Sequence, residues 1–112
     1  MFSKEIQENV YPFKFSIVIP AYNEEHRIES TIEHIQNALT PTSYEILVVD
    51  DGSTDKTKDI LNSLLKKFPS NLKNITLKKN FGKGFAIKQG FFAATGEFIL
   101  MTDADISTPI ET

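Results

Sequence analysis

The sequence contains no cysteine and no tryptophan among its 112 residues. Without cysteine, the chain forms no disulfide, binds no metal through thiolates and uses no thiol as a nucleophile. It also has no apolar run close to the roughly 20 residues that a membrane-spanning helix needs. The first ten residues are polar and mixed in charge, unlike a signal peptide. We therefore expect a cytoplasmic chain, either soluble or peripheral on the cytosolic face of a membrane.

Acidic residues are scarce in the middle of the chain. Nine lysines lie between Lys56 and Lys88, a stretch in which Asp59 is the one acid. A solvated lysine face would explain this distribution, and attraction to a phosphate-bearing partner or an anionic membrane surface is the alternative. The sequence has no arginine- and aromatic-rich patch of the kind that binds nucleic acid, so we expect no nucleic-acid partner.

Short apolar runs mark the predicted strands. They are rich in β-branched and aromatic residues, and they cover residues 15–20, 45–49, 74–79 and 97–102. Helical patterns lie between them, and this alternation predicts a parallel sheet covered by helices on both faces. The fold class is therefore α/β.

Three predicted helices connect these strands. Apolar residues recur at helical spacing over residues 25–39, which predicts the first helix. The same spacing predicts a second helix that ends near Phe68 and whose N-terminus Ser53 or Thr54 would cap. The third helix is expected to run from residues 82–84 to about Thr95, with Gly96 as its C-terminal cap. Its adjacent Phe91 and Phe92 are expected in the core rather than at a stacking site.

Polar clusters follow three of the strands, at the edge where open α/β sheets bind ligands. They are residues 20–25 (PAYNEE), 50–55 (DDGSTD) and 103–105 (DAD). Each cluster alone also has a structural interpretation as a turn or a helix cap, and a D-x-D pattern is common by chance. Taken together, the three clusters predict one ligand site.

Asp103 and Asp105 are predicted to bind a divalent cation. Alternate residues at a strand end direct their side chains to one side, and two close carboxylates repel each other unless a cation or a proton relieves them. Mg²⁺ or Mn²⁺ suits such oxygens and shares its other positions with phosphates and water.

Gly82-Lys83-Gly84 opens the third predicted helix. A helix N-terminus beside a lysine favours anions, although a tight turn is the structural alternative. G-x-G-x-x-G does not follow the first strand and no G-x-x-x-x-G-K-[ST] occurs, which argues against a dinucleotide-binding Rossmann domain and a P-loop NTPase. An aspartyl phosphatase is disfavoured because in that fold the strand that carries the D-x-D motif comes first in the chain, whereas here it comes last.

Three segments resemble the N-terminal half of a family 2 glycosyltransferase. They are residues 16–25 (SIVIPAYNEE), 44–57 (YEILVVDDGSTDKT) and 80–109 (NFGKGFAIKQGFFAATGEFILMTDADISTP). The last segment is most similar to the polyprenyl-phosphate branch, which includes dolichyl-phosphate glucosyltransferases and mannosyltransferases. The resemblance implies a three-layer, Rossmann-like GT-A nucleotide-diphospho-sugar-binding fold. It would cover residues 15–112 after an N-terminal arm at 1–14, and it would be incomplete because family members continue well beyond the D-x-D motif.

The resemblance also implies roles for individual residues. Asp50 and Asp51 would meet the base and ribose, and Asp103 and Asp105 would coordinate Mg²⁺ or Mn²⁺ on the diphosphate. Ser107 stands where some relatives carry a ligating Gln, and it is too short to ligate readily. The residues expected to bind substrate are Pro20, Tyr22, Asn23, Glu24, Asp50, Asp51, Lys83, Asp103 and Ala104.

The implied reaction moves a hexose from UDP-glucose or GDP-mannose to a polyprenyl (dolichyl-type) phosphate at a membrane surface. An ionised phosphate needs no protein base, and no residue here is an obvious one. Two alternatives stay open: an inactive or partner-dependent fragment that only binds sugar nucleotide, and a transferase that acts on a polysaccharide or another hydroxyl acceptor.

Overall fold

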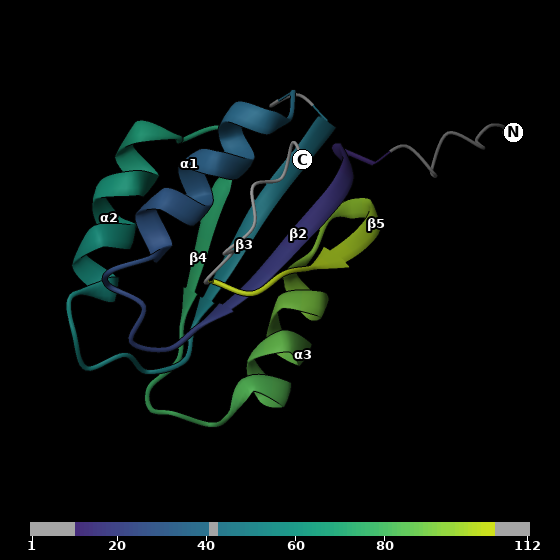
Figure 1. Cartoon of the computed structure of the whole chain (residues 1–112). Coiled ribbons are helices and arrows are strands. Elements are labelled where there is room, and N and C mark those ends of the chain that lie inside the picture. The colour runs from purple at the N-terminus through teal and green to yellow at the C-terminus, as the bar shows by residue number, and fades with distance from the viewer. Residues whose placement is uncertain (1–10, 41–42, 105–112) are drawn as a thin grey trace, which may run out of the picture.

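The computed structural model describes residues 11–40 and 43–104, and its strands form one parallel four-stranded sheet of order β4-β3-β2-β5. The elements in chain order are β2 (Phe13–Ala21), α1 (Ile28–Ala38), β3 (Tyr44–Asp50), α2 (Thr57–Lys67), β4 (Leu72–Thr76), α3 (Lys83–Ala93) and β5 (Gly96–Met101). Helices α1 and α2 lie on one face of the sheet and α3 lies on the other (Figure 1). The predicted α/β fold with a parallel sheet is confirmed. Residues 1–10 of the predicted N-terminal arm lie outside the described residues.

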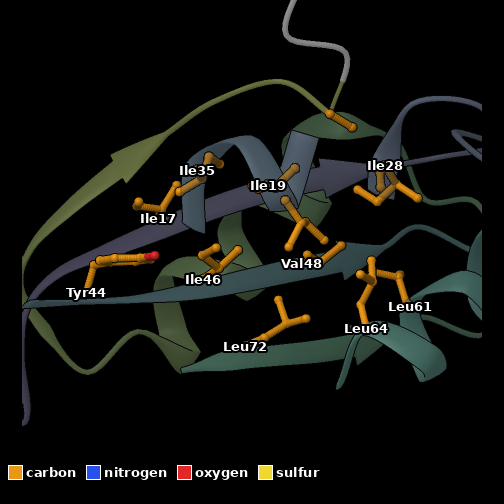
Figure 2. Packing of buried hydrophobic residues seen from close by; sticks show 13 residues of the cluster. Ile17, Ile19, Ile28, Ile35, Tyr44, Ile46, Val48, Leu61, Leu64 and Leu72 are labelled. Carbon is orange, nitrogen blue, oxygen red and sulfur yellow. The ribbon is translucent and has the colours of Figure 1, made fainter. Parts of the chain in front are cut away.

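Each face of the sheet has its own core, because side chains alternate along the strands. Ile17 and Ile19 of β2 join the cluster beneath α1 and α2, while Val18 between them joins the cluster beneath α3. Figure 2 shows the larger cluster, in which Ile28 of α1 and Leu61 of α2 pack over the strands. Each such side chain, once buried, contributes about 1.5–3 kcal/mol to folding. These two cores fix the central strands, whose carboxyl ends carry the candidate site.

A buried carboxylate links the strands near their amino ends. Glu45 in β3 is fully buried and accepts hydrogen bonds from Ser16 Oγ (2.5 Å), Lys73 Nζ (2.8 Å) and the backbone N–H of Thr95 (2.7 Å). The N–H of Gly96 in turn donates to Ser16 Oγ at 2.7 Å. Burial alone would raise the pKa of Glu45, but these hydrogen bonds together hold its pKa below the ordinary value. The network therefore ties β5 to the central strands through a charged group.

Two expected helix caps were wrong. Neither Ser53 nor Thr54 caps α2; instead Asp55 Oδ1 accepts the N–H of Thr57 at 2.9 Å. Gly96 does not cap α3, since the helix ends at Ala93 and Gly96 is the first residue of β5.

Strand β5 has the apolar sequence of a buried strand, yet it is exposed. Its four apolar residues, 98–101, are between 39% and 54% exposed. The reason is its place at the sheet edge, where it pairs with β2 and with no other described strand. Phe91 and Phe92 of α3 were expected in the core, and they are exposed as well.

Candidate functional site

A pocket of about 450 Å³ lies at the carboxyl ends of β2, β3 and β5. The strand ends hold one another there, because the N–H of Asp51 donates to Ala21 O at 2.8 Å and that of Thr102 donates to Val18 O at 3.1 Å. The residues that line the pocket are Pro20, Ala21, Tyr22, Glu24, Asp51, Asn80, Gly82, Lys83, Asp103 and Ala104. The fold thus brings seven of the nine residues expected to bind substrate around one hollow.

Asp51 organises the wall of the pocket that leads into α3. Its carboxylate is almost fully buried and accepts hydrogen bonds from the backbone N–H groups of Phe81 (2.8 Å) and Gly82 (2.9 Å) and from Asn80 Nδ2 (3.1 Å). Gly52 lets the same loop approach, since a Cβ there would lie 2.3 Å from the carbonyl carbon of Lys79. Asp51 therefore fixes the start of α3 as well as facing the hollow.

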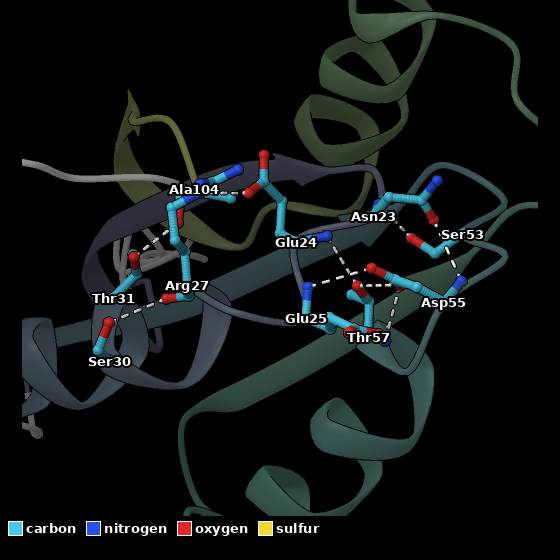
Figure 3. Close-up of polar contacts among 10 residues, drawn as sticks. All are labelled: Asn23, Glu24, Glu25, Arg27, Ser30, Thr31, Ser53, Asp55, Thr57 and Ala104. Atoms are coloured by element: carbon cyan, nitrogen blue, oxygen red, sulfur yellow. Dashed lines mark hydrogen bonds and ion pairs between the residues drawn. The ribbon is translucent and has the colours of Figure 1, made fainter.

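Two of the predicted substrate contacts, Asn23 and Asp50, do not line the pocket. Asn23 has a φ of 54°, and its Oδ1 accepts the N–H groups of Thr54 (2.8 Å) and Asp55 (3.2 Å). Figure 3 shows this side chain beside Ser53, whose Oγ accepts the N–H of Asn23 at 2.9 Å. The side chain of Asn23 thus joins the loop after β2 to the loop after β3.

Asp50 is fully buried directly behind these loops. Its Oδ1 accepts the N–H of Ser53 at 3.0 Å, while its Oδ2 is buried and has no hydrogen-bond partner in the part of the chain that the structure describes. An unpartnered buried oxygen is an acceptor that a donor group of a ligand could satisfy after a small movement of the loop.

Helix α1 anchors the other side of the pocket. Thr31 Oγ1 donates to the carbonyl oxygen of Ala104 at 2.6 Å, and so holds the segment that follows β5 (Figure 3). Arg27 Nε donates to Glu24 Oε1 at 2.8 Å, and the N–H of Glu24 donates to Thr57 Oγ1 at 2.8 Å. These contacts place Glu24 and Ala104 on the same side of the hollow.

Opposite charges face each other across the pocket mouth. Lys83 Nζ lies 2.8 Å from Asp103 Oδ1, and both side chains are more than half exposed. A second hollow of about 350 Å³ adjoins the first and shares Pro20, Lys83 and Asp103 with it. Its other lining residues, which come from α3 and from the end of β5, are Ile87, Met101 and Thr102.

The predicted metal ligands are only partly described. Asp103 lies at the pocket, whereas Asp105 and Ser107 lie outside the described residues. Within residues 11–40 and 43–104, no three acidic or histidine side chains gather in a group that could hold a metal ion. Asp103 is thus the described carboxylate with the clearest access to a cation in the hollow.

Three lining residues, Ala21, Asn80 and Gly82, were not among the individual residues expected to bind substrate. Ala21 and Gly82 do belong to predicted motifs, namely the cluster at residues 20–25 and the Gly82-Lys83-Gly84 helix start. Asn80 faces the pocket because it donates to Asp51, a partner 29 positions away that a single sequence does not reveal.

The model of the family described as "Glycosyl transferase family 2" matches residues 16–112. The chain is 43% identical over 103 residues to the dolichyl-phosphate beta-glucosyltransferase of Homo sapiens, covering 85% of this chain and 32% of the relative. It is 38% identical over 109 residues to the enzyme of the same name from Dictyostelium discoideum, covering 90% of this chain and 32% of the relative. The chain therefore spans about a third of the length of these relatives.

Solved structures are similar to this chain as well. The structure of S. aureus TarS 1-349 in complex with UDP-GlcNAc superposes with a TM-score of 0.75 at 36% identity, covering 83% of this chain and 27% of TarS. The mannosyltransferase PcManGT from Pyrobaculum calidifontis, in complex with GDP-Man and Mn²⁺, superposes with a TM-score of 0.77 at 29% identity. That match covers 87% of this chain and 29% of PcManGT. No helix in the described part of the chain is long and apolar enough to cross a membrane.

Proposed function

Because the chain belongs to glycosyl transferase family 2, we propose that its pocket is the donor site of a hexosyltransferase. The donor would be UDP-glucose or GDP-mannose, and the acceptor a polyprenyl phosphate at the cytosolic surface of a membrane. The observation that carries this proposal is the convergence of seven expected substrate residues on one hollow at the strand ends. The relatives named as dolichyl-phosphate glucosyltransferases support the choice of acceptor.

The polar surface of the pocket fits a sugar nucleotide in two ways. Gly82 and Lys83 bring a helix N-terminus and an ammonium group to the wall, and both favour the diphosphate. Tyr22 is 44% exposed at the rim and offers a ring against which a base or a sugar can pack. The same two features would hold the departing nucleotide diphosphate after transfer.

The residues present also fit a divalent cation. Asp103 already holds a positive group, the Lys83 ammonium, at 2.8 Å from its carboxylate. Carboxylate oxygens suit Mg²⁺ and Mn²⁺, and Asp103 with Asp105 would hold the ion. Such an ion, when bound, stabilises the negative charge that builds on the leaving diphosphate.

The chemistry asked of the chain itself is binding and orientation. A phosphate acceptor is ionised at neutral pH and can attack the anomeric carbon without a base. The second hollow, which shares Lys83 and Asp103 with the donor pocket, is a place from which that phosphate could approach. Lys83 would then neutralise phosphate charge on either side of the reacting carbon.

Titration calorimetry with UDP-glucose and GDP-mannose, with and without Mn²⁺, tests the donor site. We expect one donor to bind, more tightly with Mn²⁺, and Asp103→Asn to remove the Mn²⁺ effect. Asp59→Asn is the matched control, because it makes the same charge change on the exposed side of α2. If folded protein binds no sugar nucleotide under any of these conditions, the donor-site proposal is wrong.

Incubation with radiolabelled donor and a polyprenyl phosphate tests the acceptor. Formation of a labelled lipid product supports transfer to a polyprenyl phosphate, and donor binding without any such product argues against this acceptor.

A further inference from the structure

Helix α3 carries large aromatic residues on its outer surface. Phe85, Phe91 and Phe92 are 41%, 43% and 73% exposed, and Phe81, just before the helix, is 46% exposed. Helices α1 and α2, by contrast, turn their large apolar residues toward the sheet. A surface helix with a polar outer face is the usual arrangement, so the outer face of α3 is suited to contact something other than water.

The small residues of α3 explain why its aromatic residues face outward. Ala86 and Gly90 are its buried residues, one helical turn apart. A Cβ on Gly90 would lie 2.4 Å from a methyl carbon of Val18 in β2, so the helix backbone lies directly against the sheet. This close approach leaves no room for a phenylalanine on the inner face.

Lysines are interleaved with these aromatic residues. Lys79 Nζ lies 5.3 Å from the centre of the Phe81 ring, and Lys88 Nζ lies 5.9 Å from that of Phe92. The rings of Phe81 and Phe85 lie 4.7 Å apart. The spacing of positions 85, 88 and 92 places them along one side of α3, and Phe81 joins that side through its ring contact with Phe85.

The loop before α3 and the helix itself carry lysines and no acidic residue, since no Asp or Glu occurs between residues 60 and 96. The described acid that pairs with a lysine of α3 is Asp103, which lies beside Lys83 at the pocket end of the helix. We define the α3 face as Lys79, Phe81, Phe85, Lys88 and Phe92. It is a cationic and aromatic surface beside, but not part of, the donor pocket.

We propose that the α3 face docks on an anionic lipid bilayer. Aromatic rings enter the boundary between headgroups and acyl chains, while lysines extend to the anionic headgroups. A protein partner fits less well, because lysine is depleted from the cores of protein–protein interfaces. The inference rests on the proposed function in one respect, namely that a lipid-borne acceptor gives the docked state a purpose.

Docking on α3 would bring the bilayer next to the reaction site. Lys83 and Ile87 of the same helix line the second hollow, together with Met101 at the end of β5. The outer and inner sides of one helix are separated by roughly 10–12 Å. A phosphate in the headgroup layer at α3 would therefore lie about one helix diameter from the hollow that leads to Asp103.

Co-sedimentation with vesicles tests the proposal. The vesicles consist of phosphatidylcholine alone or of equal parts phosphatidylcholine and phosphatidylglycerol, and we expect binding to the anionic vesicles. Replacing both Lys79 and Lys88 by Gln should weaken the partition coefficient about 25-fold, since each lysine at an anionic surface is worth about a factor of five. The double variant Phe85→Ser/Phe92→Ser should weaken it at least tenfold, because it removes the apolar contact and leaves the charge unchanged.

The matched control is Lys58→Gln with Lys66→Gln. It removes the same charge from exposed positions on α2, on the opposite side of the sheet, and it should retain nearly all binding. Equal losses in both lysine pairs would show non-specific charge attraction and overturn the proposal. Absence of binding by folded wild-type protein would also overturn it, as would self-association that Phe85→Ser/Phe92→Ser abolishes while vesicle binding is unchanged.

Sugar-nucleotide binding by the same variants separates the two proposals. The α3-face variants should bind donor as the wild type does, and circular dichroism verifies that each is folded. Donor binding without vesicle binding refutes docking and leaves the proposed function intact. Vesicle binding without donor binding refutes the donor site and leaves docking intact.

Discussion

Replacing Asp51 by Asn should both destabilise the fold and weaken donor binding, because one carboxylate holds the loop that builds the pocket wall. In the wild type, Oδ1 accepts the N–H of Phe81, while Oδ2 accepts the N–H of Gly82 and the side-chain amide of Asn80. An Asn side chain keeps the shape but converts one of these oxygens into an NH₂ group. At least one buried N–H then faces a donor instead of an acceptor.

The expected magnitude follows from these contacts. An unsatisfied buried N–H costs about 1–3 kcal/mol, and the bond to the other oxygen loses its ionic character, so we expect a total loss of about 2–4 kcal/mol. In urea, with a slope of roughly 1–3 kcal/mol per M, the unfolding midpoint should fall by about 0.7–4 M. Asp51 is only 3% exposed, which leaves little water to replace the lost acceptor.

Urea unfolding followed by circular dichroism measures the first effect, and calorimetric titration with the donor measures the second. Asp59→Asn makes the same chemical change on the exposed surface of α2 and should shift the midpoint little. If Asp51→Asn unfolds at the wild-type midpoint and binds donor equally well, the carboxylate does not organise the loop. A loss of stability with unchanged affinity would show that the loop is held by Asp51 but contributes nothing to the donor site.

The Glu45 network predicts that the stability of the fold depends on pH. The pKa of the Glu45 carboxyl is lower in the folded protein than its ordinary value. The stabilisation that this carboxylate gives to the fold is therefore fully present above its unfolded-state pKa of about 4.3, and it is lost as the pH falls through the folded-state pKa. Glu45→Gln should therefore lower the free energy of unfolding by roughly 2 kcal/mol at pH 7. The difference in urea midpoint between variant and wild type should shrink as the pH is lowered from neutral toward pH 3. A difference that stays constant with pH would contradict this explanation. Gly52→Ala should destabilise the protein by more than about 2 kcal/mol, because Gly52 has a φ of 72° and the new Cβ would meet the backbone of Lys79 at 2.3 Å. Gly82→Ala tests backbone strain alone, because Gly82 has a φ of 106° and a ψ of 156°, a conformation essentially restricted to glycine, while its Cβ would meet no atom within 4 Å; a loss of stability in the same assay is expected there without any clash.

The central part of the fold could be predicted from the sequence because its patterns have one physical interpretation. Strand β3 has seven buried residues in succession, which is what a parallel strand between two helical layers requires. In α1, Ile28, Ile32 and Ile35 are all buried, as their helical spacing predicts. In these elements the sequence pattern predicts both the type of secondary structure and which side chains are buried.

The sequence predicted where the candidate site lies in the fold, but it predicted less well which side chains line the pocket. Residues at strand ends converge because the carboxyl ends of parallel strands meet at one edge, and Pro20, Glu24 and Asp103 lie there as expected. The direction of a side chain within a loop follows no period, however. Asn23 and Asp50 turn toward neighbouring loop N–H groups, and the partners that draw them there are set by tertiary contacts.

Helix α3 and strand β5 show why apolar content alone misplaces an element. Phe92 has the composition of a core residue, yet Ala86 and Gly90 occupy the inner face because only small residues allow the helix to lie against Val18. Strand β5 has the apolar sequence of a buried strand, yet β2 is its only neighbour among the described strands. An apolar pattern thus predicts which surfaces can exclude water, but it does not predict whether the protein core or another partner covers them. For α3, the lysines beside the rings supply the missing information, because a cationic aromatic face matches a bilayer surface better than a protein core.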